Sequence, residues 1–260
     1  MSTVRTRIGL RSRTGPGAVG ILVTAVTTVT LGLAGCSLPS TGAAGSAGSA
    51  GVGTSADAAG GSTGGSGTAV AGTALAALAT VKVAKAGSLS GYTREKFGQA
   101  WADVDHNGCD TRDDVLKRDL TKTTFRTTGG HRCVVLSGVL ADPYTAKQIH
   151  FTKAAATKVQ IDHVVPLADA WRTGASGWST VRRTALANDP GNLLAVDGSS
   201  NESKGDSDAS EWLPPNHSYR CAYVARQVGI KAKYHLTVTP AERDAIRAVL
   251  STCRTQRALG

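Results

Sequence analysis

The chain has 260 residues, a length that fits one or two domains, and 29 Lys and Arg against 19 Asp and Glu give it a formal charge of +10. Four arginines fall within the first 13 residues, which hold no acid, so the remainder carries 25 basic against 19 acidic residues, a charge nearer +6. A basic surface attracts nucleic acids and anionic cell-wall polymers alike, so charge alone excludes neither partner.

The first 35 residues have the order of an export signal. The arginine-rich start is followed by an apolar stretch from about Gly17 to Leu33 and then by Leu33-Ala34-Gly35-Cys36. This tetrad resembles the lipobox of bacterial lipoproteins, in which the signal is cut before the Cys and the Cys receives a lipid. We therefore expect a signal peptide over residues 1–35 and lipidation of Cys36. The alternatives are an ordinary signal peptide or a single membrane anchor, although about 17 apolar residues are marginal for crossing a bilayer.

Residues 36–87 are expected to form a tether. From Ser37 to about Gly72 the chain is nearly all Gly, Ala, Ser and Thr, with Asp57 as the single charge. Such a stretch buries too little apolar area to offset the entropy of ordering it. Residues 71–86 are richer in Ala, Leu and Val and could form a short helix that leads into one folded domain over residues 88–260.

Within that domain the hydrophobic patterns predict a mixture of helices and strands, so the expected fold class is α+β. The expected helices cover residues 94–101, 111–120, 167–173, 180–188, 219–228 and 240–254. The expected strands cover residues 132–140, 147–152, 159–163 and 192–196. The segment from Asp103 to Gly108 partly imitates a calcium loop, but the required distal Glu is replaced by Asp114, which favours a simple turn.

Five cysteines fit an exported protein. If Cys36 is lipidated, four remain, and an even number in an oxidising compartment favours disulfides. Four cysteines allow three pairings, and we favour Cys109–Cys133 with Cys221–Cys253 because each pair closes a local segment. The rival is a zinc site, but the chain has no C-x-x-C pair, and the gaps of 23, 87 and 31 residues match no common zinc module.

The segment from residue 160 to residue 215 carries the chemistry. Hydrolysis of a phosphodiester needs a base with a pKa near neutrality and a hard cation on oxygen ligands. Asp162 and His163 are neighbours at the end of an expected strand, so their side chains diverge, and one can face a metal while the other faces water. Asn201 can return a neutral oxygen to the same place, and Lys204 follows three residues later, on the same side if that segment is helical.

The ordered motifs resemble a known nuclease family. They are Asp-His-Val-Val-Pro-Leu from Asp162, Asn-Leu-Leu from Asn192, and Asn-x-x-Lys-Gly-Asp from Asn201. Together they resemble the ββα-metal (His-Me finger) core of HNH endonucleases. More narrowly, the chain is similar to actinobacterial secreted HNH endonuclease family proteins that carry the domain found at the C terminus of GmrSD-type restriction enzymes. That similarity also takes in Asp103–Arg112, Asp142-Pro143-Tyr144 and Trp212-Leu213-Pro214-Pro215.

The resemblance implies a role for each motif residue. Asp162 would be a metal ligand, His163 the general base, and Asn192 the catalytic Asn that ties the loop between the strands and positions the base. Asn201 would be the second metal ligand, at the place where many relatives have a final His. Lys204 would contact the substrate phosphate. With all-oxygen ligands the expected cation is Mg²⁺, with Mn²⁺ as the alternative.

We therefore expect a monomeric, secreted, metal-dependent endonuclease that cleaves DNA, or alternatively RNA, with little sequence specificity. His163 would deprotonate the attacking water, and the cation would stabilise the departing 3′ oxygen. Contact with a membrane would come through the lipid anchor only. One alternative is a non-catalytic surface module that binds nucleic acid or a cell-wall polymer on a degenerate nuclease fold. A cysteine or serine hydrolase is disfavoured because the cysteines are assigned to disulfides and no G-x-S-x-G occurs in the expected folded domain over residues 88–260.

Overall fold

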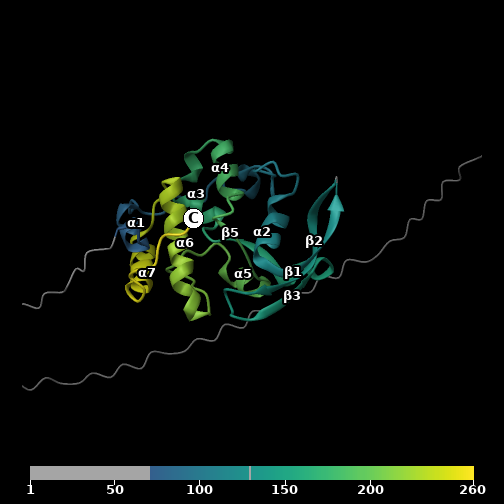
Figure 1. Ribbon diagram of the computed structural model, residues 1–260. Coiled ribbons are helices and arrows are strands. Elements are labelled where there is room, and N and C mark those ends of the chain that lie inside the picture. Colours follow the sequence, from purple (N-terminus) through teal and green to yellow (C-terminus); the bar gives the residue numbers. More distant parts are fainter. Residues whose placement is uncertain (1–70, 129) are drawn as a thin grey trace, which may run out of the picture. The chain divides into compact units, whose positions relative to one another are not determined.

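The computed structural model describes residues 71–128 and 130–260 (Figure 1). The expected signal peptide, Cys36 and most of the expected tether lie outside the described residues. The rest is an α+β fold, as the sequence predicts. The α-helices are α1 (Ala74–Thr80), α2 (Thr111–Asp119), α3 (Leu167–Arg172), α4 (Thr180–Ala187), α5 (Gly198–Lys204), α6 (Arg220–Tyr234) and α7 (Pro240–Ser251). The strands are β1 (Leu120–Thr128), β2 (His131–Ala141), β3 (Gln148–Thr152), β4 (Val159–His163) and β5 (Leu193–Asp197). No helix in the described part of the chain is both long and apolar enough to cross a membrane.

The folded domain begins earlier than expected. Helix α1 is capped by Thr73, whose side chain accepts a hydrogen bond from the Ala76 N–H, and it packs against α6 and α7. Ala74 and Leu78 of this helix are buried in a core that they share with Val224 and Leu250. The expected boundary at residue 88 is therefore too late, because the Ala- and Leu-rich segment buries an apolar face.

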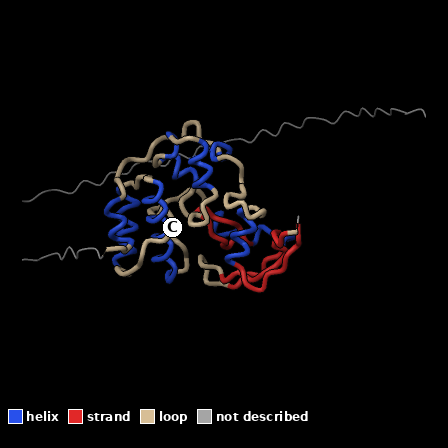
Figure 2. The backbone as a smooth tube through the Cα atoms, turned by 45° about the horizontal axis from the view of Figure 1, so that its top comes forward, coloured by secondary structure: helices blue, strands red, loops and turns tan. Residues whose placement is uncertain are grey.

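The strands form two separate antiparallel sheets (Figure 2). Strands β1, β2 and β3 form one sheet, at the opposite end of the domain from α1, α6 and α7 (Figure 1). Strand β1 was not predicted. Its sequence, LTKTTFRTT, has few apolar residues, and it is a strand because it pairs with β2 from Leu120 opposite Leu140 onward.

Strands β4 and β5 form the second sheet, which lies between two hydrophobic cores. On one face Ile161 and Leu193 pack with the core that includes α2 and the three-stranded sheet. On the other face Leu194 and Val196 pack with the core around α6. Residues that pair directly lie on the same face, so Asp162, opposite Leu194, faces α6, and His163, opposite Leu193, faces the other way. The divergence expected from the sequence is thus present.

Two of the expected helices differ most from the prediction. Helix α6 continues through Gly229 to Tyr234, beyond the expected end at Val228. Gly229 does not end the helix but makes room for the C-terminal segment, since a Cβ there would collide with the backbone of Leu259. The helix expected over residues 94–101 is only a 3₁₀ turn, η1 (Arg94–Phe97), which ends at Gly98 with a φ of 82°.

The disulfides join Cys109 to Cys133 and Cys221 to Cys253, which confirms the favoured pairing. The first connects the start of α2 to β2, and the second connects α6 to the end of α7. Residues 103–108 form a turn closed by their own side chains: Asp103 accepts from the N–H of Gly108, and the Asn107 amide donates to Asp105 and Asp114. In the sequence this turn lies between Trp101 and Arg112, which both line the cavity described next.

Candidate active site

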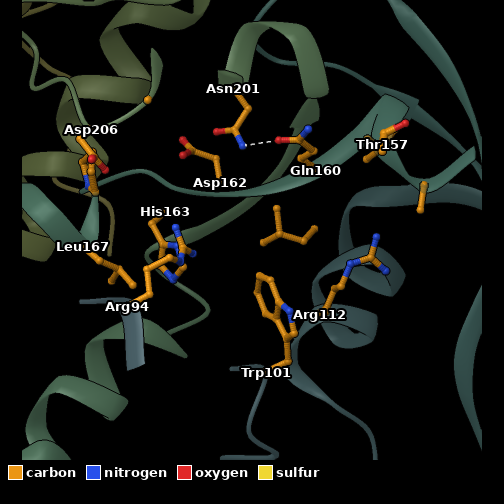
Figure 3. A pocket seen from close by; sticks show the side chains of 15 residues that line it. Arg94, Trp101, Arg112, Thr157, Gln160, Asp162, His163, Leu167, Asn201 and Asp206 are labelled. Atoms are coloured by element: carbon orange, nitrogen blue, oxygen red, sulfur yellow. Dashed lines mark hydrogen bonds between the residues drawn. The ribbon is translucent and has the colours of Figure 1, made fainter. Parts of the chain in front are cut away.

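A cavity of about 460 Å³ lies along the free edge of β4 (Figure 3). Because β4 pairs with β5 on one side only, five consecutive residues from Val159 to His163 line it. Asn201 of α5 also lines it, since α5 begins directly after β5, whose last residue, Asp197, caps the helix. The order strand, strand, helix thus brings Asp162, His163 and Asn201 to one cavity.

Asp162 is held by two buried neighbours. The Tyr144 hydroxyl donates to its Oδ2 at 2.5 Å, and the Lys204 ammonium donates to its Oδ1 at 2.8 Å. Burial and the Asp162 carboxylate raise the pKa of Tyr144 well above 10, so this hydroxyl remains a donor. A carboxylate has about four lone-pair positions, so one on each oxygen remains for a further ligand.

The segments that follow β2 and α5 meet at Tyr144. Its ring contacts the rings of Trp212, Tyr219 and Tyr223. Asn216 donates its backbone N–H to the carbonyl of Tyr144 at 2.8 Å. The Asp-Pro-Tyr and Trp-Leu-Pro-Pro motifs of the sequence therefore meet at Tyr144. Together they orient the Tyr144 hydroxyl, which donates to Asp162.

His163 is buried, and its ring is fixed at one nitrogen. Nε2 lies 2.8 Å from the carbonyl oxygen of Ala187, and a carbonyl can only accept, so Nε2 carries the proton and Nδ1 is the acceptor. The indole of Trp101 lies nearly parallel to the imidazole, with ring centroids 6.3 Å apart. Burial lowers the pKa of His163 to about 4, below the near-neutral value expected from the sequence, so the ring is neutral near pH 7 and a weaker base than expected.

Asn201 directs an oxygen at Asp162. Its Nδ2 donates to Gln160 Oε1 at 2.8 Å, which sets the orientation of the amide and leaves Oδ1 as the free end (Figure 3). In the figure that oxygen points towards the Asp162 carboxylate. Two acceptors that face each other repel unless a cation or a donor lies between them, so this oxygen pair fits a hard divalent cation.

The structure places Lys204 differently from the prediction. Its side chain has no exposed surface, and the ammonium binds Asp162 Oδ1 and, at 2.9 Å, the backbone carbonyl of His163. From this position it cannot reach a phosphate in the cavity. It lies under Asp162 and neutralises that carboxylate.

Asn192 is fully buried next to the strand end that carries His163. Its Oδ1 accepts from the backbone N–H of Val165 at 2.8 Å, and its Nδ2 donates to the carbonyl of the same residue at 3.2 Å. Its own backbone carbonyl accepts from the Val164 N–H. The side chain therefore ties down the segment that directly follows His163, and it does not line the cavity.

The cavity also holds Arg94, Trp101 and Arg112, to which the sequence analysis assigned no role in the site. In Figure 3 the Trp101 indole lies between the two arginines. Neither guanidinium makes a hydrogen bond or an ion pair with another described residue, whereas Arg118 and Arg183 bind backbone carbonyls. No local motif marks Arg94 and Trp101, because they reach the site only through the tertiary fold.

The fold and this cavity define a class: an α+β domain that presents a carboxylate, an amide oxygen and a neutral imidazole beside two free arginines. Residues 110–249, more than half of the chain, match the family described as GmrSD restriction endonucleases, C-terminal domain, and the chain belongs to that family. It is also similar to a protein of Arthroderma benhamiae named "Uncharacterized secreted protein", with 40% identity over 173 residues, or 66% of this chain and 80% of that protein. No solved structure matches the chain.

Proposed function

We propose that the protein is a metal-dependent endonuclease that hydrolyses phosphodiester bonds of nucleic acid, with DNA favoured as the substrate and little sequence specificity. The observation that carries the proposal is the convergence of Asp162, Asn201 and His163 on one cavity. Membership of a restriction-endonuclease domain family supports it. The order of β4, β5 and α5 supports the further interpretation of this region as a ββα-metal core of the HNH type.

In this proposal His163 is the general base. With Nε2–H bound to the Ala187 carbonyl, the lone pair of Nδ1 is available to take a proton from a water molecule in the cavity. The oxygen of that water then forms a bond to phosphorus, and the bond from phosphorus to the departing 3′ oxygen breaks. Asn192 keeps the base in place through its two hydrogen bonds to Val165. We infer that Asn192 is a positioning residue.

Asp162 and Asn201 would hold the cation, and Mg²⁺ suits their oxygen ligands, with Mn²⁺ as the alternative. A bound divalent cation would supply charge neutralisation at the phosphoryl group. Because Lys204 already balances the charge of Asp162, the protein offers little net negative charge to the ion. Water and substrate phosphate would complete its ligands, as is usual for Mg²⁺.

Arg94 and Arg112 take the role that the sequence suggested for Lys204. Free guanidinium groups present several donors in a geometry that matches phosphate oxygens. Contacts to phosphate hold the backbone of a nucleic acid and carry no sequence information. Little specificity is therefore expected from these two residues.

The experiment is digestion of plasmid DNA and of RNA by the purified full chain with Mg²⁺, with Mn²⁺ and with EDTA. His163→Ala should lower the rate roughly 100- to 10,000-fold, the usual contribution of a positioned base. His150→Ala is the matched control, because His150 is exposed on β3. Cleavage that survives EDTA, or a rate unchanged in His163→Ala, would overturn the mechanism.

One observation favours the alternative of a non-catalytic binding module. The Lys204–Asp162 pair neutralises the carboxylate on which a cation would depend. In that case the protein would bind nucleic acid or a cell-wall polymer through the same arginines and cleave neither. Binding without cleavage under any metal condition would favour this reading.

We further propose that the protein acts outside the cytoplasm. Two disulfides persist only in oxidising compartments, and the relative from Arthroderma benhamiae is named as secreted. The signal peptide over residues 1–35 and a lipid on Cys36 would give this location, with the membrane contacted through the anchor alone. Mass spectrometry of the membrane fraction would detect a diacylglyceryl group on Cys36, and a mature protein that begins elsewhere would exclude it.

A further inference from the structure

A second cavity, of about 340 Å³, adjoins the candidate active site. It is lined mainly by apolar groups, including Phe97, Trp101 and Leu167, and His163 and Arg94 line both cavities. Trp101 and Leu167 also line both, so Trp101 forms part of the boundary between them. Any group that enters the second cavity would therefore lie next to the candidate base.

Trp101 is held for this position against its backbone preference. Its φ is 58°, a left-handed value that is rare for a bulky side chain and that persists only where the surroundings enforce it. Thr111 holds this segment through two hydrogen bonds. Its hydroxyl donates to the carbonyl of Ala102, and its backbone N–H donates to the carbonyl of Trp101 at 3.4 Å. The indole is partly exposed, so a planar ligand can reach its surface.

Asn188 also lines this cavity, and its side chain carries an unsatisfied acceptor. Its Nδ2 donates to the backbone carbonyls of Thr184, at 3.0 Å, and Gln99, at 3.4 Å, which fixes the orientation of the amide. Its Oδ1 is buried and has no hydrogen-bond partner among the described residues. A buried acceptor without a partner is costly, so a ligand N–H would fit here.

We propose that this cavity is a subsite for an unpaired nucleobase next to the scissile phosphate, and that the protein therefore prefers single-stranded to duplex nucleic acid. The inference rests on the proposed function and names its substrate class. An aromatic wall stacks on the face of any base, and the Asn188 oxygen accepts an N–H from the edge that pairing would otherwise occupy. A paired base would first have to leave its stack.

The first test compares initial rates on a single-stranded oligonucleotide and on the duplex of the same sequence. Single strands should be cleaved at least about tenfold faster, because a duplex base enters the cavity only after unstacking. Trp101→Ala in the full chain should lower kcat/KM for single strands by roughly 5- to 100-fold, the usual effect of losing one stacking platform. Trp101→Phe should retain much of the rate, and Trp178→Ala, a partly exposed Trp outside both cavities, should leave it unchanged.

The second test measures binding without cleavage. A single-stranded oligonucleotide with one 2-aminopurine is titrated in EDTA, where stacking on an aromatic ring quenches its fluorescence. The wild type and His163→Ala should both quench it, Trp101→Phe should quench it less, and Trp101→Ala should not quench it. If circular dichroism shows that Trp101→Ala is misfolded, the weaker quenching by Trp101→Phe is the test. Equal rates on single strands and duplex would overturn the subsite, and so would quenching by the Trp101 variants that equals the quenching by the wild type. Quenching with no cleavage of any substrate would refute the nuclease proposal and leave the base subsite standing.

Discussion

Replacing Lys204 by Met tests whether this lysine supports Asp162 or contacts substrate. The Lys204 ammonium and the Asp162 carboxylate lie 2.8 Å apart with almost no exposed surface. At an effective dielectric constant of about 20, two unit charges at this distance attract each other by about 6 kcal/mol. Much of this is offset by the cost of desolvating both charges, but removal of one partner leaves the other charge buried alone. Lys204→Met should therefore destabilise the fold by about 3–5 kcal/mol.

The assay is urea unfolding with both disulfides intact, followed by circular dichroism, on a double-mutant cycle of Lys204→Met and Asp162→Asn. Each single variant leaves an uncompensated buried charge, and the double variant leaves none, so the double variant should lose much less than the sum of the two. Lys117→Met is the matched control. Lys117 is exposed on α2, and its replacement should change the free energy of unfolding by less than about 0.5 kcal/mol.

The two interpretations of Lys204 give opposite results. A phosphate contact on the cavity surface would raise KM and leave the stability of the free protein almost unchanged. A buried support of Asp162 lowers stability and kcat together. If the stability effects of the two single variants add without coupling, the ion pair does not stabilise the site, and Lys204 is not a buried support of Asp162.

Two further predictions concern buried hydrogen bonds and pH. Tyr144→Phe removes the donor at Asp162 Oδ2. It should lower kcat by roughly 10- to 100-fold in steady-state assays, the usual effect of losing a group that orients a metal ligand, and leave KM nearly unchanged. A change confined to KM would contradict this role. Burial and nearby Asp169 raise the pKa of Glu242 from 4.5 to about 7, although Lys231 binds both carboxylates and opposes the shift. Between these pH values the unfolded chain has lost this proton and the folded chain retains it, so this group should lower stability as pH rises from 4.5 to 7 and add no further loss above 7. Glu242→Gln should therefore gain in melting temperature relative to the wild type between pH 5 and pH 7.5, and a pH-independent difference would exclude the effect.

The strands and helices around the site were predictable because their patterns are local. The segment Val159–His163 alternates and ends at the motif, and the structure gives the same bounds. Helix α2 begins at Thr111, as predicted, and Asp110 caps it with a side chain that accepts from the Asp113 N–H. Strand β1 was missed because its exposed, Thr-rich sequence carries almost no hydrophobic signal, and its structure depends on pairing with β2. Strand propensity of this kind depends on context more than helix propensity does.

The position of Lys204 could not be derived from its spacing alone. Three residues along a helix rotate the side chain by about 300°, so positions 201 and 204 lie near each other but about 60° apart around the axis. In α5 that difference decides the outcome, because Asn201 faces the cavity and Lys204 turns beneath β4. The spacing correctly placed Asn201 and Lys204 near Asp162. The packing of α5 on β4 determined which of the two side chains reached the cavity.

The site therefore combines residues of a local sequence motif with residues that only the tertiary structure brings to it. Asp162, His163 and Asn201 come from adjacent elements, so a short ordered motif is enough to propose them. Arg94 and Trp101 precede the region that matches the family, and both line the cavity. Arg94 lies on η1, which packs against α4, and the backbone carbonyl of Trp101 accepts from the N–H of Thr111 at the start of α2. The shared motif accounts for the candidate chemistry. The proposed preference for single strands depends in addition on Trp101, which precedes the matched region. In relatives with another residue at position 101 we expect this preference to change while the reaction stays the same.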